Sequence, residues 1–206
     1  MGIAGRTLRI AVTSCLLASL ISLPLGSLIH FRRFRGKRVL VNVIQTLYSV
    51  PTVIVGLFVF VLLSRTGPLG ELGLLFTPTA MVIGQMILIT PILLGLTISA
   101  LRGVSPEIAE TATSLGASGP QLALLTLREA RYAVVAALIL GFGRAVSELG
   151  IAMMVGGNIR GFTRVMTTAI SLATTRGELE LALALGMLLL LLALVINIVL
   201  NRLQQR

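Results

Sequence analysis

Five long apolar segments constrain this chain more than any other feature of its sequence. They cover roughly residues 8–29, 39–63, 79–101, 132–155 and 179–200. At 1.5 Å per residue, about 22 residues form a helix of about 33 Å, enough to cross a hydrocarbon core of about 30 Å. Hydrophobic residues make up 56% of the chain and charged residues only 12%, which excludes a water-soluble domain. Because backbone groups in lipid must be satisfied within each helix, we predict an all-α polytopic membrane protein with five spans.

The basic residues between these segments predict how the chain crosses the membrane. If the spans alternate, one side holds ten of them: Arg32, Arg33, Arg35, Lys37, Arg38, Arg102, Arg128, Arg131, Arg202 and Arg206. The other side holds six: Arg6, Arg9, Arg65, Arg160, Arg164 and Arg176. Positive charge marks the cytoplasmic side, so we expect the amino end outside and the carboxyl end inside. Arg6 and Arg9 lie on the side that the rule disfavours.

The net charge of +10 does not indicate nucleic-acid binding, because no basic stripe is interleaved with aromatic residues. Lys37 is the only lysine, and no Gly-x-x-x-x-Gly-Lys motif surrounds it, so the chain lacks a phosphate-binding loop for ATP. His30, the only histidine, has no partner for a nucleophile or a metal, which argues against an intramembrane enzyme. We predict no catalytic residue, metal ligand or cofactor in this chain.

Residues 102–131, predicted to be cytoplasmic, form a longer connection than joining two spans requires. The connection begins with a helix start made of an N-cap, a first-position proline and a first-turn acid: Ser105, Pro106 and Glu107. Apolar residues then recur at helical spacing: Ile108, Ala112 and Leu115. Gly116 supplies a stop, and Glu110 falls on the polar face. The pattern predicts a short amphipathic helix, and periodicity alone fits a helix lying at the lipid interface equally well.

The fourth span and the segment after it carry further polar residues. Arg144 and Glu148 lie one helical turn apart, so they can form an ion pair that makes both tolerable within a membrane. Such a pair could contact a substrate, or it could only hold the span to its neighbours or to a second copy of the chain. Residues 156–178, predicted to lie outside, combine glycines and hydroxyls with three arginines, groups that attract a tetrahedral oxyanion. Arg160 and Arg164 could instead face water or lipid headgroups, or contact a binding protein.

Glu110-Thr111-Ala112-Thr113-Ser114-Leu115-Gly116-Ala117 resembles the EAA motif of binding-protein-dependent ABC importer permeases. In that family the loop forms a coupling helix that docks on a separate ATPase subunit. The resemblance implies that coupling to the ATPase rests on Glu110, Thr111, Ala112, Leu115, Gly116 and Ala117. The chain departs from the motif at Thr111, and at Arg128-Glu129 where many members have Leu-Pro.

The segments Arg144–Gly150 and Gly157–Thr163 resemble the molybdate/tungstate branch of this family, which carries Arg-Ala-x-x-Glu-x-Gly followed by Gly-Asn-Ile-x-Gly-x-Thr. The forms Met-Met-Val-Gly-Gly-Asn and Thr-Arg-Val-Met-Thr-Thr-Ala-Ile look most like tungstate permeases. On this resemblance the residues expected at the pathway or gate are Arg144, Ser147, Glu148, Asn158, Arg160, Thr163 and Arg164.

The resemblance implies a single type I importer transmembrane domain over residues 1–206, in the cytoplasmic membrane of a bacterium or archaeon. Its expected partners are ABC ATPase subunits that bind ATP and Mg²⁺, a periplasmic oxyanion-binding protein, a second copy of the chain and the lipid bilayer. The expected function is ATP-driven import of tungstate, with molybdate or another oxyanion as the alternative. A secondary transporter or channel is the second hypothesis, although the sequence shows no inverted repeat or proton relay.

Overall fold

The computed structural model describes residues 2–32 and 34–204, so Arg33 and Arg206, counted above among the basic residues, lie outside the described part. Every regular element in that part is helical. The elements in chain order are α1 (Ile3–Phe31), α2 (Lys37–Thr46), the 3₁₀ turn η1 (Leu47–Ser49), α3 (Thr52–Leu63), the 3₁₀ turn η2 (Gly70–Leu72), α4 (Pro78–Arg102), α5 (Pro106–Ser114), α6 (Gly119–Glu129), α7 (Arg131–Val146), α8 (Gly150–Gly156), α9 (Met166–Thr175) and α10 (Leu179–Gln204).

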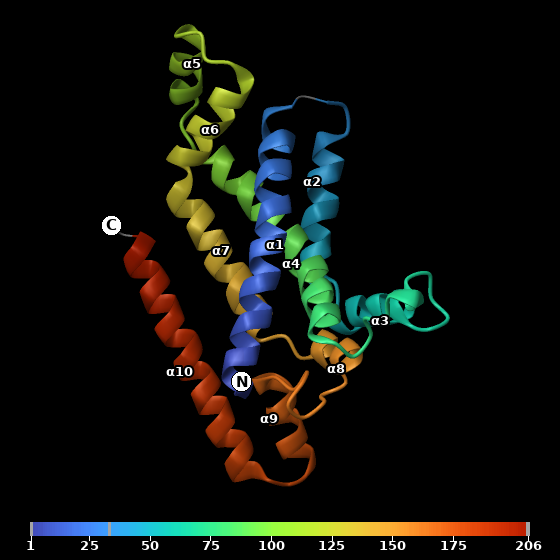
Figure 1. Ribbon diagram of the computed structural model, residues 1–206. Helices are drawn as coiled ribbons and strands as arrows, with labels where there is room; N and C mark the ends of the chain where they lie inside the picture. The colour runs from blue at the N-terminus through green and yellow to red at the C-terminus, as the bar shows by residue number, and fades with distance from the viewer. Residues whose placement is uncertain (1, 33, 205–206) are drawn as a thin grey trace.

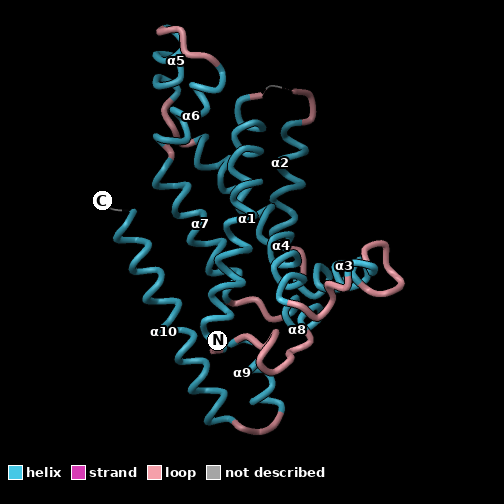
Figure 2. Tube along the Cα trace, viewed as in Figure 1, coloured by secondary structure: helices cyan, strands magenta, loops and turns pink. Residues whose placement is uncertain are grey.

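The long helices form an elongated bundle with two distinct ends (Figure 1). The turn between α1 and α2 lies toward one end, where α5 and α6 project furthest. The amino terminus, α8 and α9 lie toward the other end, and α3 projects sideways from the bundle. The Cα trace in Figure 2 shows that loops gather at these two ends and around α3, whereas the middle of the bundle is mostly helical.

In the described part of the chain, three single helices are long and apolar enough to cross a membrane: α1, α4 and α10 over Leu179–Val199. The other two predicted spans are each divided into two helices. Residues 37–63 bend by 95° between η1 and α3, and residues 131–156 bend by 55° between α7 and α8. If each bent pair counts as one span, the described chain has up to five.

The first bend follows from Pro51. Proline has no N–H to continue a helix and forces the preceding residue into an extended conformation. Val50 accordingly has ψ 126° and Pro51 has ψ 129°, and α3 begins at the next residue. We expected a single segment over 39–63, and the proline explains the change of direction within it.

Small residues let α1 approach α4 closely. Four α1 side chains are fully buried at this contact or near it: Ala11, Ser14, Ala18 and Ser22. A Cβ on Gly26 would lie only 2.9 Å from Thr97 Cγ2. Ser14 Oγ lies 3.1 Å from Gln85 Oε1, and the Gln85 amide donates to the Ala145 carbonyl at 3.2 Å, which joins α1, α4 and α7. Close packing of small residues with a few polar bonds is how membrane helices associate.

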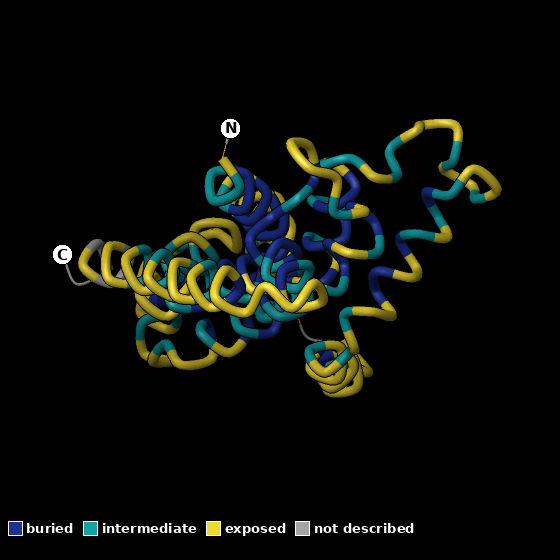
Figure 3. Tube along the Cα trace, turned by 90° about the horizontal axis from the view of Figure 1, so that it is seen from below, coloured by how far each residue is buried: buried dark blue, intermediate teal, exposed yellow. Residues whose placement is uncertain are grey.

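The periphery of the bundle is apolar. Large hydrophobic side chains are exposed along α10, for example Leu183 and Leu190, and along α3, for example Ile54 and Phe58. Figure 3 shows α10 as a largely exposed helix beside a buried centre. Such surfaces fit a hydrocarbon solvent or another helix rather than water.

Tyr48 rests directly on the backbone of α4 at Gly95, since a Cβ there would overlap the Tyr48 hydroxyl and lie 2.7 Å from Cζ. We expect Gly95→Ala to lower the free energy of unfolding by about 1–3 kcal/mol through overpacking. Thermal unfolding in detergent would measure this. Gly186→Ala is the matched control, because a Cβ on Gly186 in α10 meets nothing within 4 Å. Equal unfolding temperatures for the two variants would contradict the packing described here.

Candidate coupling and pathway sites

The predicted short helix in residues 102–131 is present as α5. Pro106 occupies its first turn, and Ser105 occupies the N-cap position, although its hydroxyl makes no capping bond. Gly116 has φ +83°, and the two bonds of a Schellman motif close the helix: Gly116 N–H to the Thr113 carbonyl and Ala117 N–H to the Ala112 carbonyl, both at 2.9 Å. The stop predicted at Gly116 therefore has its expected geometry.

A second helix, α6, follows α5, and the sequence reasoning missed it. Ser118 precedes the helix, and the Gln121 Oε1 accepts from the Ser118 N–H at 2.8 Å and from its hydroxyl at 2.9 Å. Ser-x-x-Gln before an apolar run is the signature of a capping box, so the signal was available in the sequence. The two helices together form a helical hairpin, the α5–α6 hairpin, at one end of the molecule (Figures 1 and 2).

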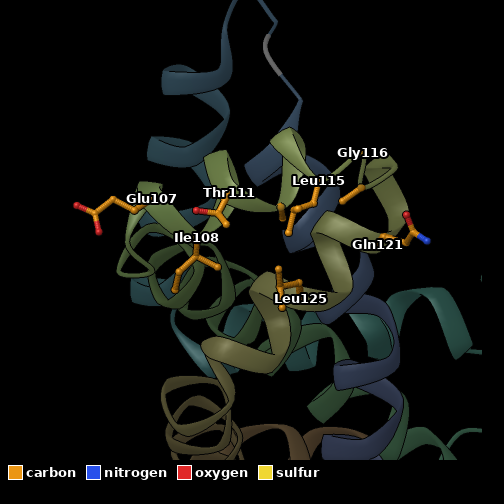
Figure 4. Close-up of a pocket in the computed structure, with 9 residues that line it drawn as sticks. Glu107, Ile108, Thr111, Leu115, Gly116, Gln121 and Leu125 are labelled. Carbon is orange, nitrogen blue, oxygen red and sulfur yellow. The ribbon is translucent and has the colours of Figure 1, made fainter.

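A cleft of about 720 Å³ lies between the two helices of this hairpin (Figure 4). Five of the six residues predicted for coupling line it: Thr111, Ala112, Leu115, Gly116 and Ala117. The cleft also contains Gln121 and Leu125 from α6. Glu110 is exposed and lies outside the lining, and Leu115 is 84% exposed. An apolar side chain that is this exposed on a helical hairpin is suited to contact with a partner surface.

The break between α7 and α8 is held by one buried carboxylate. Glu148 is 2% exposed. Its Oε2 accepts from the Arg144 guanidinium of α7 at 2.8 Å, and its Oε1 accepts from the Ile151 N–H of α8 at 3.0 Å. Its backbone carbonyl accepts from the Thr167 hydroxyl of α9 at 2.9 Å. The ion pair predicted from sequence is present, and Glu148 also caps the next helix, as an acceptor at a helix start does.

The two partners of this ion pair differ in exposure. The Arg144 side chain is 35% exposed and that of Glu148 only 1%, so the cation is partly accessible whereas the carboxylate is buried. Ser147, at the break, is exposed. The break also contacts α3, because a Cβ on Gly150 would lie 2.6 Å from Thr52 Oγ1. The two bent spans therefore meet close to their breaks.

The loop after α8 contains the other predicted pathway residues. Gly157 and Asn158 both have positive φ, at 67° and 50°, which turns the chain sharply. Arg164 is half-buried, and its Nε donates to Asn158 Oδ1 at 3.0 Å. Thr163 is fully buried and accepts from the Ile159 N–H at 2.9 Å. Arg160 is exposed. Asn158 and Thr163 thus brace the loop, whereas Arg160 is open to an approaching group.

The start of α1 clamps this loop, a contact that sequence reasoning did not identify. Arg6, 8% exposed, donates to the carbonyls of Gly161 at 2.6 Å and Arg164 at 2.7 Å. The neighbouring Thr7 hydroxyl accepts from the Met166 N–H at 3.0 Å. These bonds join residues more than 150 positions apart in the chain, and no local pattern signals them. In the part of the chain that is described, no three histidine, cysteine, aspartate or glutamate side chains gather to hold a metal.

The fold and these sites define a polytopic helical membrane protein with interrupted spans and a helical hairpin projecting from one end. The chain belongs to the family described as "Binding-protein-dependent transport system inner membrane component", which matches residues 22–206. It is therefore a membrane component of a transport system, as the sequence predicted, rather than an enzyme of its own.

The chain is also similar in sequence to two transport permeases and in fold to one solved structure. The tungstate uptake system permease protein TupB of Peptoclostridium acidaminophilum is 43% identical over 196 residues, covering 95% of this chain and 86% of that protein. A probable anion ABC transporter permease protein of Haloferax volcanii is 40% identical over 185 residues, covering 87% of this chain and 80% of that protein. A chain of the MetNI methionine ABC transporter in an inward-facing conformation has the same fold, with a TM-score of 0.78 and 17% identity over 97% of this chain and 92% of that chain. The predicted family and the importer fold are confirmed.

The role of Glu148 can be tested through protein stability. Because its carboxylate is buried and bonded on both sides of the break, we expect Glu148→Ala to lower the free energy of unfolding by about 3 kcal/mol. Glu148→Gln should lower the free energy of unfolding by less, because the amide oxygen of glutamine can still accept from the Ile151 N–H. Thermal unfolding in detergent would measure both.

The pair itself needs a double-mutant cycle. The double variant Arg144→Gln/Glu148→Gln should lower the free energy of unfolding by less than the sum of the two single changes. Each single change leaves one charged or polar partner without its match, whereas the double change removes both. Strict additivity would mean that the bond at 2.8 Å contributes nothing to holding the break.

Proposed function

We propose that this chain is the permease subunit of an ATP-driven tungstate importer. The observation that carries the proposal is the 43% identity to a tungstate permease along 95% of the chain. The motifs at Arg144–Gly150 and Gly157–Thr163, assigned above to the same branch, support it. Molybdate or another oxyanion is the second candidate, favoured by the relative described only as an anion permease.

The proposed topology has five spans, each bent pair crossing once, with the amino end outside and the carboxyl end in the cytoplasm. The arrangement in Figure 1 supports it, because the α5–α6 hairpin and the basic turn after α1 lie toward the same end. The amino terminus and the loop after α8 lie toward the opposite end. This division agrees with the count of ten basic residues against six.

The proposed ATPase site is the α5–α6 hairpin. A separate ABC subunit that binds ATP and Mg²⁺ would contact the exposed Leu115 and Glu110 and pull on the hairpin during its cycle. Since α6 ends at Glu129 and α7 begins at Arg131, only Ala130 separates the hairpin from the helix that leads to the Glu148 break. Movement of the hairpin would therefore reach that break through a single helix.

The proposed pathway uses the polar groups near the break and the loop after α8. Arg160 and Arg164, with Asn158, would meet the oxyanion delivered by a periplasmic binding protein at the outer mouth. Arg144 and Ser147 would contact it deeper in the membrane, with Glu148 behind Arg144 rather than on the path. Thr163 would only hold the loop. A second copy of the chain would complete the pathway on a two-fold axis, covering part of the exposed apolar surface of α3.

The function is tested by uptake into proteoliposomes that contain this chain with its co-purified ATPase and binding protein. We expect tungstate to accumulate only when Mg-ATP is supplied, and elemental analysis would measure it. Molybdate accumulating equally well would favour the broader oxyanion function. Accumulation driven by an ion gradient without ATPase would contradict the proposal and favour a secondary transporter.

The coupling role is tested by charge reversal on the hairpin. We expect Glu110→Arg to reduce ATP-driven uptake at least about tenfold, the effect of losing about 1.4 kcal/mol of interaction with the ATPase. The variant should reach wild-type levels in the membrane, because Glu110 is exposed. Glu180→Arg is the matched control, as Glu180 is an exposed glutamate at the start of α10. A Glu110→Arg variant with normal uptake would remove the hairpin as the docking site.

A further inference from the structure

A second cavity lies at the end of the bundle opposite the α5–α6 hairpin. It has a volume of about 750 Å³ and is bounded by the first turns of α1, the start of α4 and the loop after α8. The basic residues in its lining are Arg6 and Arg9, and the hydroxyls are Thr13, Thr77 and Thr79. The remaining lining is mostly apolar: Ile10, Leu17, Leu74, Val82 and Phe162 among others. None of the residues that line the cavity is acidic.

The two arginines of this cavity differ in burial and in hydrogen bonding. Arg6 is buried, and its guanidinium is bonded to the backbone carbonyls of the loop after α8. Arg9 is exposed, and among the described residues its guanidinium makes no hydrogen bond or ion pair with the protein. In the proposed topology both arginines also lie on the outer side of the membrane, where the positive-inside rule disfavours arginine. The bonds to the loop after α8 account for the position of Arg6, whereas no contact among residues 2–32 and 34–204 accounts for Arg9.

The cavity is polar at one end and apolar along its length. Arg9 lies about 9 Å from the first residue of α1 along the helix axis, near the membrane boundary, and Leu17 lies about 12 Å further along. Leu17 and Leu20 are exposed on α1, at 40% and 71%, so the apolar wall continues onto a face suited to acyl chains. A membrane phospholipid has the matching arrangement, with a polar headgroup at the membrane boundary and acyl chains that extend into the membrane.

We propose that this cavity binds an anionic phospholipid, with its phosphodiester on Arg9 and an acyl chain along Leu17 and Val82. A guanidinium offers paired donors that match phosphate oxygens, and long basic side chains reach toward headgroups from within a membrane helix. Two positive charges with no acid among the lining residues favour phosphatidylglycerol over lipids whose headgroup also carries an amine. The proposal goes beyond the transport function and does not depend on which ion is transported.

Native mass spectrometry of the full-length protein, purified with whatever subunits accompany it, tests the proposal. Phosphatidylglycerol and phosphatidylcholine are titrated separately, and the bound fraction is measured for each variant. We expect the wild type to bind phosphatidylglycerol more tightly than phosphatidylcholine. Arg9→Gln should weaken phosphatidylglycerol binding about tenfold, the effect of losing one charge-assisted contact, and Arg9→Lys should weaken it less.

Two further variants make the result specific. Arg176→Gln is the matched control, an exposed arginine at the end of α9 that does not line the cavity, and it should bind the lipid as the wild type does. Thr13→Trp fills the cavity without changing its charge and should also weaken binding. Because Thr13 and Arg9 are both exposed, neither change disturbs the buried core.

The outcomes separate the proposal from its alternatives. Equal lipid binding by the wild type and Arg9→Gln would overturn it, as would displacement of the lipid by inorganic tungstate at concentrations that saturate transport. The second result would assign the cavity to free oxyanion instead. Because lipid binding is measured without uptake, failure here leaves the transport function standing, and failure of transport leaves the lipid site standing.

Discussion

A helix that breaks inside a membrane leaves backbone N–H and C=O groups without partners, and no water is present to bind them. In this protein the Glu148 carboxylate provides a partner for one such group between α7 and α8, because it accepts from the Ile151 N–H of α8 while it also accepts from the Arg144 guanidinium of α7. Thr167 donates to the carbonyl of the same residue, so α9 is tied to the same point.

These bonds hold the chain at the point where its direction changes by 55° between α7 and α8. Only the cation of this pair is partly accessible, because the carboxylate is buried and occupied by its bonds to Arg144 and to the Ile151 N–H. The structural and the proposed transport roles of the pair are therefore divided between its two members. The sequence alone could not make that division.

The elements predicted from sequence were those with local signals. Ser105, Pro106 and Gly116 predicted both ends of α5 because helix caps depend on neighbouring residues. The apolar runs predicted the membrane class, and the spacing of Arg144 and Glu148 predicted their ion pair. By contrast, hydropathy cannot distinguish a straight span from a bent one, so the 95° bend at Pro51 was not predicted. The Arg6 clamp was missed because its partners are backbone carbonyls far along the chain.

The α5–α6 hairpin and the loop after α8, at opposite ends of the molecule, are connected through α7 and the Glu148 break. The α5–α6 hairpin leads through Ala130 into α7, α7 ends at the Glu148 break, and the break is bonded to α9. The loop after α8 is in turn held by the start of α1. A displacement at the hairpin thus has a route of covalent and hydrogen-bonded contacts to the opposite end, which is what a permease driven by an outside ATPase requires.

The central claim is that the ATPase contacts the α5–α6 hairpin and no other end of the chain. Site-specific crosslinking in native membranes tests it most directly, after Cys15, the only cysteine, is replaced by serine. A bifunctional maleimide on Leu115→Cys should capture the ATPase subunit, whereas the same reagent on Leu72→Cys, an exposed leucine in the connection between α3 and α4, should not. Capture from position 72, or none from position 115, would contradict the account.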